Sequence, residues 1–324
     1  KFENMINNVT QTNRTTAVVN GTAAVQVALK LVGIKKNDEV ITQGLTFVAT
    51  ANSIVYNNAH PVFLDVDYDT MGLSPKAVYD FLDEFGELRD DGCYNKRTGR
   101  KISACMPMHT FGFPVHLDEL TEICNNWKIP LVEDATESLG SKYKGISTGS
   151  FGEIGAFSFN GNKIITTGGG GAITTKNIAL GDRAKFLTTT AKQPHPYDYI
   201  HSEIGYNFRM PNINAALGCA QLERLKPFLK NKRELAKKYE SFFKNLDIKF
   251  RTETIDTTAN YWLMCIEIEE ESVHKQFLKL SNNSNVMTRP IWELMSNLPM
   301  YLNCQRDSQK NAALLKKRII NIPS

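Results

Sequence analysis

Four polar segments of the sequence, each next to a short apolar run, contain residue types that can do chemistry. Residues 20–23 (NGTA) open a helical pattern, and small residues there leave backbone N–H groups free to bind an anion. Residues 131–135 (LVEDA) end an apolar run on acids, and a buried acid needs a cation or hydrogen-bond donors. Taken singly, these two segments fit a tight turn and a helix cap equally well.

The other two segments lie further along the chain. Lys163 stands between residues 156–160 (AFSFN) and the four glycines at 168–171. A lysine with little water around it can act as a Schiff-base nucleophile, although a surface lysine before a turn is the ordinary alternative. Residues 205–212 (GYNFRMPN) mix polar and aromatic side chains before another helical pattern, which is also typical of a packed loop.

Together, these segments predict a site for pyridoxal 5′-phosphate. Lys163 supplies an amine for the aldehyde of the cofactor, and Asp134 supplies an acid that keeps the ring nitrogen protonated. Residues 20–23 supply donors for the phosphate. The glycines match neither the GxGxxG pattern of dinucleotide sites nor the P-loop, which disfavours a nicotinamide-dependent reductase.

The composition excludes several other classes of protein. The 324 residues are 42% hydrophobic and 22% charged, as in ordinary globular proteins, and the net charge of +4 does not indicate a nucleic-acid partner. No apolar run approaches the ~20 residues that span a bilayer. The six cysteines lack zinc-ligand spacing and favour free, buried thiols in a reducing compartment. We therefore expect a cytoplasmic protein without a metal site.

Strand and helix patterns alternate over the first two thirds of the chain. We expect strands at residues 16–19, 40–42, 61–65, 101–108, 129–132 and 155–159, with helices between them. A helix is predicted to start at Ser74-Pro75, with Ser as its cap. This alternation predicts an α/β fold with a mainly parallel sheet flanked by helices. In such a sheet, ligands bind at the carboxyl ends of the strands.

The pattern changes near Pro227, where helices rich in Lys and Arg begin. Residues 226–238 carry six basic residues, which we interpret as a solvated helix face. We expect an isolated strand at 262–268 and a surface loop or hairpin at 84–100. The chain is therefore divided into a large cofactor-binding domain, residues 1–225, and a smaller α+β domain, residues 226–324. Apolar residues at helical spacing in 2–9 predict a helix at the beginning of the chain.

The chain resembles the DegT/DnrJ-type nucleotide-sugar aminotransferases of the aspartate-aminotransferase superfamily. It is most similar to the LegC-like branch, the UDP-4-amino-4,6-dideoxy-N-acetylglucosamine transaminases. The similarity extends over nearly the whole chain and is densest between residues 15 and 225. The segments that carry it are NGTAA (20–24), TFVATAN (46–52), MHTFGFP (108–114), VEDATESLGS (132–141), FSFNGNKIITTGGGG (157–171), GYNFRMPNINAALG (205–218) and INIPS (320–324).

The resemblance implies a role for individual residues. Lys163 matches the Schiff-base lysine, and its presence favours transamination because related sugar dehydratases carry His there. Asp134 matches the acid at the ring nitrogen, and Phe47 matches the aromatic side chain that stacks on the ring. Glu137 stands where much of the family has Gln or His near the ring hydroxyl, so an acid here needs a shared proton or another partner.

The resemblance also implies how the phosphate is bound and how the protein assembles. Thr22, Ala23 and Ser158 match its donors. Asn207 is similar to an asparagine that reaches the phosphate from the neighbouring subunit, which implies a homodimer with shared sites. Family members also carry an N-terminal segment before the position of Lys1, and we expect such a segment to precede this chain.

The implied reaction moves an amino group from glutamate to a nucleotide-linked 4-keto-6-deoxy sugar, here UDP-2-acetamido-2,6-dideoxy-hexos-4-ulose, as used in polysaccharide biosynthesis. One alternative is amination at another position or of a GDP- or dTDP-sugar. Another is a non-catalytic binding or regulatory module with this fold, which the presence of both Lys163 and Asp134 disfavours. The residues alone do not decide between the sugars and nucleotides.

Overall fold

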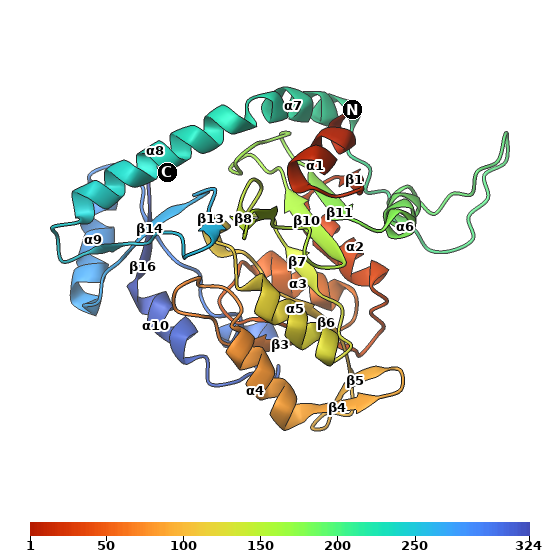
Figure 1. Cartoon of the computed structure of the whole chain (residues 1–324), viewed down its shortest axis with the longest axis horizontal. Helices are drawn as coiled ribbons and strands as arrows, with labels where there is room; N and C mark the ends of the chain where they lie inside the picture. Colours follow the sequence, from red (N-terminus) through yellow and green to blue (C-terminus); the bar gives the residue numbers. More distant parts are fainter.

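The computed structural model describes all 324 residues and is built around one twisted sheet (Figure 1). Parallel bridges at Cys105–Leu131 and Met108–Asp134 join two smaller sheets into the strand order β3-β2-β6-β7-β10-β11-β1. Neighbouring strands are parallel except at β11, which runs antiparallel to both β10 and β1. The strands are β1 (Arg14–Val18), β2 (Glu39–Gln43), β3 (His60–Leu64), β6 (Lys101–Met106), β7 (Val132–Asp134), β10 (Ile154–Ser158) and β11 (Gly171–Thr175).

Helices cover both faces of this sheet and confirm the predicted α/β class. One face carries α2 (Gly21–Leu31), α3 (Val48–Tyr56) and α6 (Ile178–Thr188). The other carries α4 (Pro75–Phe85), α5 (Leu117–Asn126), α1 (Phe2–Thr10) and α7 (Asn212–Glu223). Side chains alternate between the faces along each strand, so that Ala156 of β10 packs beneath α2 and Phe157 packs beneath α1.

The predicted elements match the structure best where a local chemical feature fixes an end. The Ser74 hydroxyl accepts from the Ala77 N–H and Pro75 is the first residue of α4, as predicted. Helix α1 and the edge hairpin of β4 (Gly86–Arg89) and β5 (Gly92–Asn95) are also confirmed. The strand expected at 129–132 lies at Val132–Asp134 instead, because its ladder with β10 begins at Val132.

One strand of the central sheet has no predicted counterpart. β11 begins at Gly171, the last of the four glycines. Because glycines precede and begin this strand, its short run of β-forming residues does not stand out in the sequence. The glycine is required there, because a Cβ atom at Gly171 would lie 2.4 Å from the carbonyl oxygen of Asn20. The close approach brings the start of β11 against the beginning of α2.

The C-terminal part contains the long helix α8 (Leu225–Phe243), followed by a second sheet (Figure 1). This antiparallel sheet has the order β12 (Lys249–Phe250), β14 (Met264–Glu267), β16 (Ile319–Ile322), β15 (Arg289–Pro290), with α9 (Glu271–Asn283) and α10 (Lys310–Arg318) packed on it. The strand expected at 262–268 is present as β14, but the prediction that it is isolated is wrong. Its partners are strands of two to four residues, too short to show a sequence period.

Short elements complete the chain. They are the 3₁₀ turns η1 (Thr110–Gly112), η2 (Met295–Asn297) and η3 (Pro299–Tyr301), and a small sheet of β13 (Thr257–Thr258), β8 (Lys142–Tyr143) and β9 (Ile146–Ser147). Because β13 pairs with β8, the small sheet joins the C-terminal part to the loop that follows β7.

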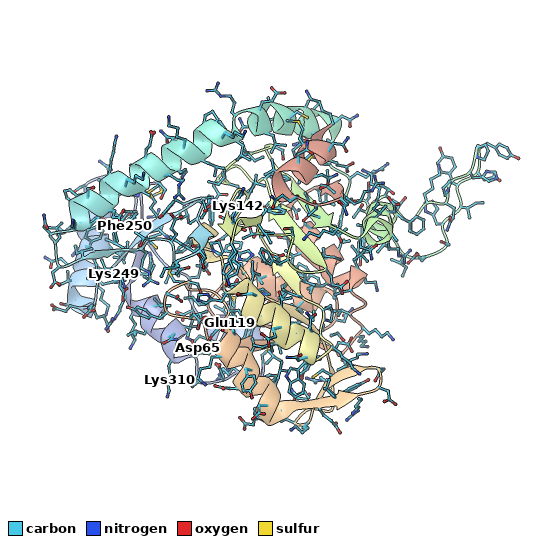
Figure 2. All side chains as sticks on the ribbon, viewed as in Figure 1. Asp65, Glu119, Lys142, Lys249, Phe250 and Lys310 are labelled. Atoms are coloured by element: carbon cyan, nitrogen blue, oxygen red, sulfur yellow. The ribbon has the colours of Figure 1, made fainter.

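The central sheet and the C-terminal part are also joined at Asp65. Its carboxylate accepts from the N–H groups of Asn311 and Ala312, at the N-terminus of α10. Figure 2 labels Asp65 and Lys310 at this junction. The large apolar cluster of the C-terminal part includes Leu45 and Phe111 from the first part of the chain. A domain boundary at residue 226 stays a proposal.

Two further predictions concern the cysteines and membrane spans. All six cysteines are free, and five of them are buried, Cys304 being partly exposed. No helix of the structure combines the length and the apolar character that a membrane crossing needs.

Candidate active site

A cavity of about 840 Å³ opens at the carboxyl ends of β7 and β10 and has two walls. We call the first the sheet wall, since it follows the strand ends and the starts of α2 and α3. It consists of Asn20, Gly21, Thr22, Val25, Phe47, Ala49, Thr50, Asp134, Thr136, Glu137, Ser158, Asn160, Asn162 and Lys163. The second, the C-terminal wall, consists of Trp262, Leu263, Arg289, Pro290, Ile291, Trp292, Glu293 and Asn321.

Asp134 is the last residue of β7, and both of its carboxylate oxygens are held by hydroxyl groups. Thr50 donates to Oδ2 at 2.8 Å, and Thr136 donates to Oδ1 at 2.6 Å. The residue is only 2% exposed, so these bonds replace water that the carboxylate loses on burial. The acid therefore enters the cavity in a fixed orientation.

The start of α2 forms a small cradle against Ser158. The first N–H groups of a helix have no intrahelical acceptor, and those of Gly21 and Thr22 lie at this position in α2. A Cβ atom at Gly21 would lie 2.6 Å from the Ser158 Cβ, so only glycine allows β10 and α2 to approach this closely. Ser158 and Thr22 both line the cavity. A bound anion could therefore accept hydrogen bonds from hydroxyl groups and from backbone N–H groups on this side.

Lys163 lies on the turn after β10, and its amine has two close neighbours. Its Nζ is 3.6 Å from Glu137 Oε1, longer than a hydrogen bond, and 3.6 Å from the ring centroid of Trp262. The side chain is 13% exposed, and its exposed part faces the cavity lining. A primary amine with little exposure to solvent is therefore available inside the cavity.

Glu137 is buried beside this amine. Burial raises the pKa of the Glu137 carboxyl to about 7, and the nearby Lys163 ammonium and the N–H of Phe111 oppose the rise. The Phe111 N–H donates to Oε2 at 2.9 Å, which leaves Oε1 facing Lys163. The carboxyl can thus gain or lose a proton near neutral pH while it stays in place.

Phe47 supplies the aromatic surface of the sheet wall. It is the residue before α3, its side chain is 49% exposed, and its ring centroid lies 6.2 Å from that of Trp292 on the C-terminal wall. A half-exposed phenyl ring on a cavity wall is suited to stacking against a planar ligand.

Two of the predicted cofactor residues do not line the cavity. The N–H of Ala23 donates to the side chain of Asn20 at 2.7 Å and is therefore used in capping α2. Asn207 lies outside the cavity, where its Oδ1 accepts from Arg209. The other predicted residues, Thr22, Phe47, Asp134, Glu137, Ser158 and Lys163, all lie on the sheet wall.

Several lining residues are absent from the sequence prediction. Thr50 and Thr136 lie within two of the segments that carry the family resemblance. The residue type alone does not reveal that their hydroxyl groups donate to the carboxylate of Asp134. Trp262 begins the expected strand 262–268, which marks it as core and not as a neighbour of Lys163. Arg289 and Trp292 come from a segment with no periodic pattern, and only tertiary structure places them on the cavity.

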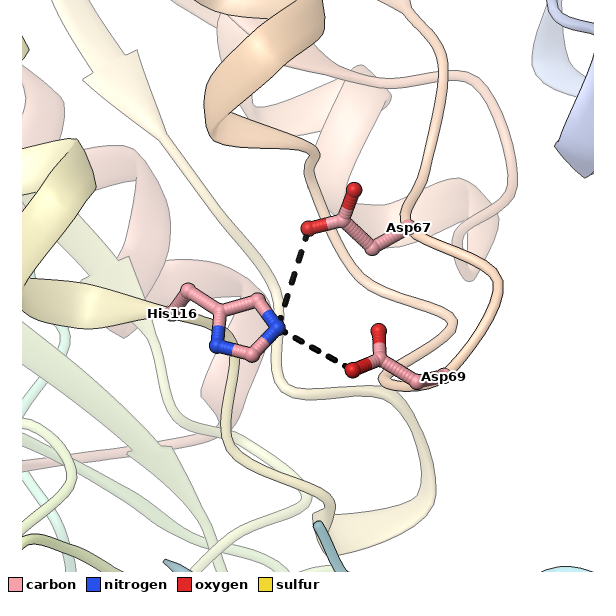
Figure 3. Close-up of side chains that lie close together, drawn as sticks. All are labelled: Asp67, Asp69 and His116. Atoms are coloured by element: carbon pink, nitrogen blue, oxygen red, sulfur yellow. Dashed lines mark hydrogen bonds and ion pairs between the residues drawn. The ribbon is translucent and has the colours of Figure 1, made fainter. Parts of the chain in front are cut away.

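A second group of titratable side chains lies outside this cavity (Figure 3). His116 Nε2 lies 3.2 Å from Asp69 Oδ2 and 3.9 Å from Asp67 Oδ2. Burial raises the pKa of Asp67, and the hydrogen bond to Asp69 raises that of His116. The two carboxylates and the imidazole lie close enough together to bind one cation. They already form ion pairs with one another, which connect the loop before α4 to the start of α5. Sequence spacing could not reveal the group, because 47 positions separate Asp69 from His116.

The comparisons with known proteins agree with this architecture. The chain matches the sequence profile of the DegT/DnrJ/EryC1/StrS aminotransferase family over residues 1–324. EpsN of Bacillus subtilis (strain 168), described by its name as a pyridoxal phosphate-dependent aminotransferase, is 38% identical over 286 residues, which are 88% of this chain and 71% of EpsN. GDP-perosamine synthase of Escherichia coli O157:H7 is 34% identical over 326 residues, 100% of this chain and 84% of that enzyme.

Among solved structures, the aminotransferase TlmJ from Streptoalloteichus hindustanus has the same fold. It superposes with a TM-score of 0.89 and 23% identity, covering 99% of this chain and 84% of TlmJ. The profile match over the full chain and the two relatives above 30% identity lead to one conclusion. This chain belongs to the DegT/DnrJ/EryC1/StrS aminotransferase family.

Proposed function

We propose that this protein is a pyridoxal phosphate-dependent aminotransferase that moves an amino group from glutamate to a nucleotide-linked 4-keto-6-deoxy sugar. The observation that carries the proposal is the convergence of Lys163, Asp134 and the start of α2 on one cavity of an aminotransferase fold. The name of EpsN supports the same cofactor.

The donor set of the sheet wall fits this cofactor. Gly21 lets the start of α2 approach Ser158 closely, since any Cβ there would collide with the serine, and so brings the first N–H groups of α2 and the serine hydroxyl together as donors for a phosphate. Phe47 offers a ring face, Asp134 a fixed carboxylate, and Lys163 an amine within the same cavity. When bound, pyridoxal phosphate supplies an aldehyde that bonds to amines and a protonated ring that accepts electrons from the neighbouring carbon.

Lys163 has two tasks in this proposal. Its Nζ holds the cofactor until the amino donor arrives, and it then takes the proton that leaves the α-carbon of glutamate. The flexible stem lets the amine reach that carbon, and its enclosed position in the cavity raises its effective concentration there. The Nζ would pass that proton on to the cofactor, and in the second half of the cycle it would move a proton in the opposite direction, from the cofactor to the C4 carbon of the sugar.

Asp134 and Glu137 act on two different sides of the ring. The Asp134 carboxylate, fixed by Thr50 and Thr136, keeps a proton on the ring nitrogen by charge pairing. Glu137 lies next to Lys163 and has a pKa of about 7, so it shares a proton with the ring hydroxyl or with the lysine amine near neutral pH. This assigns the acid a role where much of the family has an amide or imidazole.

The C-terminal wall receives the substrates. Arg289 donates through Nη1 to Asn282 and to the Thr288 carbonyl, which leaves its other N–H groups for a carboxylate or diphosphate. The sequence resemblance favours a UDP sugar. The 34% identity to a GDP-perosamine synthase favours a GDP sugar as the second candidate.

A panel assay tests the proposal and separates these substrates. The protein is loaded with pyridoxal phosphate and incubated with glutamate and either a UDP-, GDP- or dTDP-linked 4-keto-6-deoxy sugar, and 2-oxoglutarate and amino sugar are measured. We expect equal amounts of both products with one nucleotide preferred. No 2-oxoglutarate with any sugar, together with no absorbance from bound cofactor, would favour a binding or regulatory module.

We further propose a homodimer in which Asn207 completes the phosphate site of the partner subunit. In its own chain Asn207 is exposed and lies outside the cavity, which is consistent with a role across an interface. Mixing inactive Lys163→Ala chains with inactive Asn207→Asp chains tests this. In a mixed dimer, one site collects both defects and the other none, so activity returns. Confirmed exchange without recovery would contradict a shared site.

A further inference from the structure

Trp262, on the C-terminal wall, contacts the segment of Lys163 in two ways. Its indole N–H donates to the carbonyl oxygen of Asn162 at 2.6 Å, one residue before the lysine. Its ring face lies 3.6 Å, at the centroid, from Lys163 Nζ. One side chain therefore fixes both the turn that carries the lysine and the position of the amine itself.

The indole is itself held rigidly. Trp262 is 5% exposed, its backbone N–H donates to Asn260 Oδ1 at 2.8 Å, and its carbonyl oxygen accepts from Lys232 at 3.1 Å. Tyr261, just before it, has a φ of 51°, a left-handed conformation that a tyrosine adopts only when its surroundings enforce it. These contacts fix the backbone from which the ring projects, and a turn of the ring away from Lys163 would break the indole bond to Asn162.

The same segment also positions the other neighbour of the amine. Asn260 Nδ2 donates to the carbonyl oxygens of Glu137 and Leu139, at 2.9 and 3.0 Å. Asn260 lies so close to η1 that a Cβ atom on Gly112 would be 1.8 Å from Asn260 Oδ1. Residues 260–262 thus position both groups that flank Lys163 Nζ, which are the Glu137 carboxyl and the Trp262 ring.

We propose that Trp262 is a positioning residue that holds the free amine of Lys163 against its ring face. This rests on the proposed function, because the amine must be free while the amino donor occupies the cofactor. A lysine stem has many rotamers, and Glu137 Oε1 at 3.6 Å is beyond hydrogen-bond distance. The face of an indole attracts the ammonium form, which the lysine takes once it has accepted a proton, so the ring holds the released side chain inside the cavity.

The test begins with cofactor-free protein, so that it does not depend on turnover. Wild type, W262F, W262M and the control W127F, whose indole lies outside the cavity, are treated with limiting acetic anhydride, and acetylation is measured by peptide mass spectrometry. Lys76, with a side chain 79% exposed, serves as the internal reference in every sample.

A ring over the amine shields it, so we expect Lys163 in wild type, W127F and W262F to react at similar rates relative to Lys76. In W262M, which keeps an apolar side chain but no ring, Lys163 should react about five- to tenfold faster. Equal rates in W262F and W262M would show that only the bond to Asn162 matters and would overturn the proposal. An unchanged rate in W262M would overturn it as well.

Kinetics of the loaded enzyme give a second measurement, in which W262F carries the test if W262M folds poorly. W262F should keep kcat within about threefold of wild type, although it lacks the indole N–H. In W262M kcat should fall about tenfold or more while the KM for glutamate changes little. A tenfold loss in W262F would contradict the proposal. If the wild type showed neither cofactor absorbance nor turnover, the proposed function would be refuted. The acetylation rates would still show whether the Trp262 ring covers Lys163, because they are measured without cofactor.

Discussion

The two walls of the cavity are built in different ways. On the sheet wall, functional groups follow directly from the ends of strands: Asp134 ends β7, and Ser158 ends β10. On the C-terminal wall, Trp262, Arg289 and Trp292 come from short strands and irregular segments around the second sheet. Parallel strands bring their carboxyl ends to one edge, so the first wall is fixed by topology. The second wall depends on how the C-terminal part packs against it.

This difference suggests a division of labour. Polar groups of the sheet wall are held by short hydrogen bonds, as Asp134 is by two threonine hydroxyls. Arg289 on the opposite wall is exposed and keeps N–H groups without partners. We expect changes to the sheet wall to affect chemistry with every substrate, and changes to Arg289 to affect substrate binding. Trp262 is the exception on the C-terminal wall, because it contacts Lys163 and the residue before it.

The largest effect is expected from Lys163→Ala. Without the amine, no other group on the cavity can hold the cofactor covalently and move the proton, so kcat should fall about a thousandfold or more with all substrates. The measurement is steady-state amino transfer from glutamate. Lys142→Ala, on the exposed side of β8, is the matched control and should keep wild-type activity. Comparable losses in both variants would point to general damage.

Asp134→Asn should have the next largest effect. The amide can keep a hydrogen bond to Thr50 or Thr136 but has no charge to hold a proton on the ring nitrogen. We expect the fold and part of the cofactor binding to remain while turnover drops about a hundredfold. If turnover stays within about tenfold of wild type, roughly 1.4 kcal/mol in barrier, the acid serves only the local structure.

Arg289→Ala probes the opposite wall. Removal of its guanidinium should raise the KM for the acidic substrates about tenfold, since the groups it binds are present before and during the reaction. The value of kcat should change less than about threefold. A large loss of kcat with an unchanged KM would show that Arg289 itself takes part in the chemistry and would contradict its assignment to substrate binding.

Glu137→Gln should show a smaller, pH-dependent effect on stability. Because burial raises the pKa of Glu137 to about 7, above its unfolded value, the native protein binds more protons than the unfolded chain in this range. Its contribution to stability is therefore retained below the unfolded pKa and lost as pH rises toward about 7. The free energy of unfolding of the variant relative to wild type should increase by roughly 1–3 kcal/mol between about pH 5 and pH 8.

Urea unfolding of the cofactor-free proteins at several pH values measures this difference. Glu122→Gln, a substitution on the surface of α5 away from the cavity, provides the control and should give a difference that does not vary with pH. If wild type and Glu137→Gln respond identically to pH, Glu137 titrates as an ordinary exposed acid, and its proposed proton sharing has no basis.

The sequence predicted the sheet wall better than the C-terminal wall for a physical reason. Lys163 and Asp134 belong to motifs of adjacent residues at strand ends, and the alternation of strands and helices brings such ends together. Ala23 shows the limit of this reasoning, since its N–H caps α2 through Asn20 instead of facing the cavity. The partner of a given N–H is a matter of local geometry that residue type does not specify.

The C-terminal wall could not be predicted in this way. Strands β12 and β15 contain two residues each, so they show no period, and their pairing with β14 and β16 is set by packing. Trp262 is apolar and buried in the C-terminal cluster, which is what a core residue looks like in a sequence. Its contact with Lys163 becomes visible only when the two parts of the chain are brought together.

Reduction with borohydride shows whether Lys163 is the residue that holds the cofactor. The protein is loaded with pyridoxal phosphate, reduced, digested and mapped by mass spectrometry, with Lys163→Ala treated in parallel. We predict that the cofactor mass is found on the peptide that contains Lys163 and is absent from the variant. Labelling of a different lysine in wild type, with Lys163→Ala still able to transfer amino groups, would contradict the account.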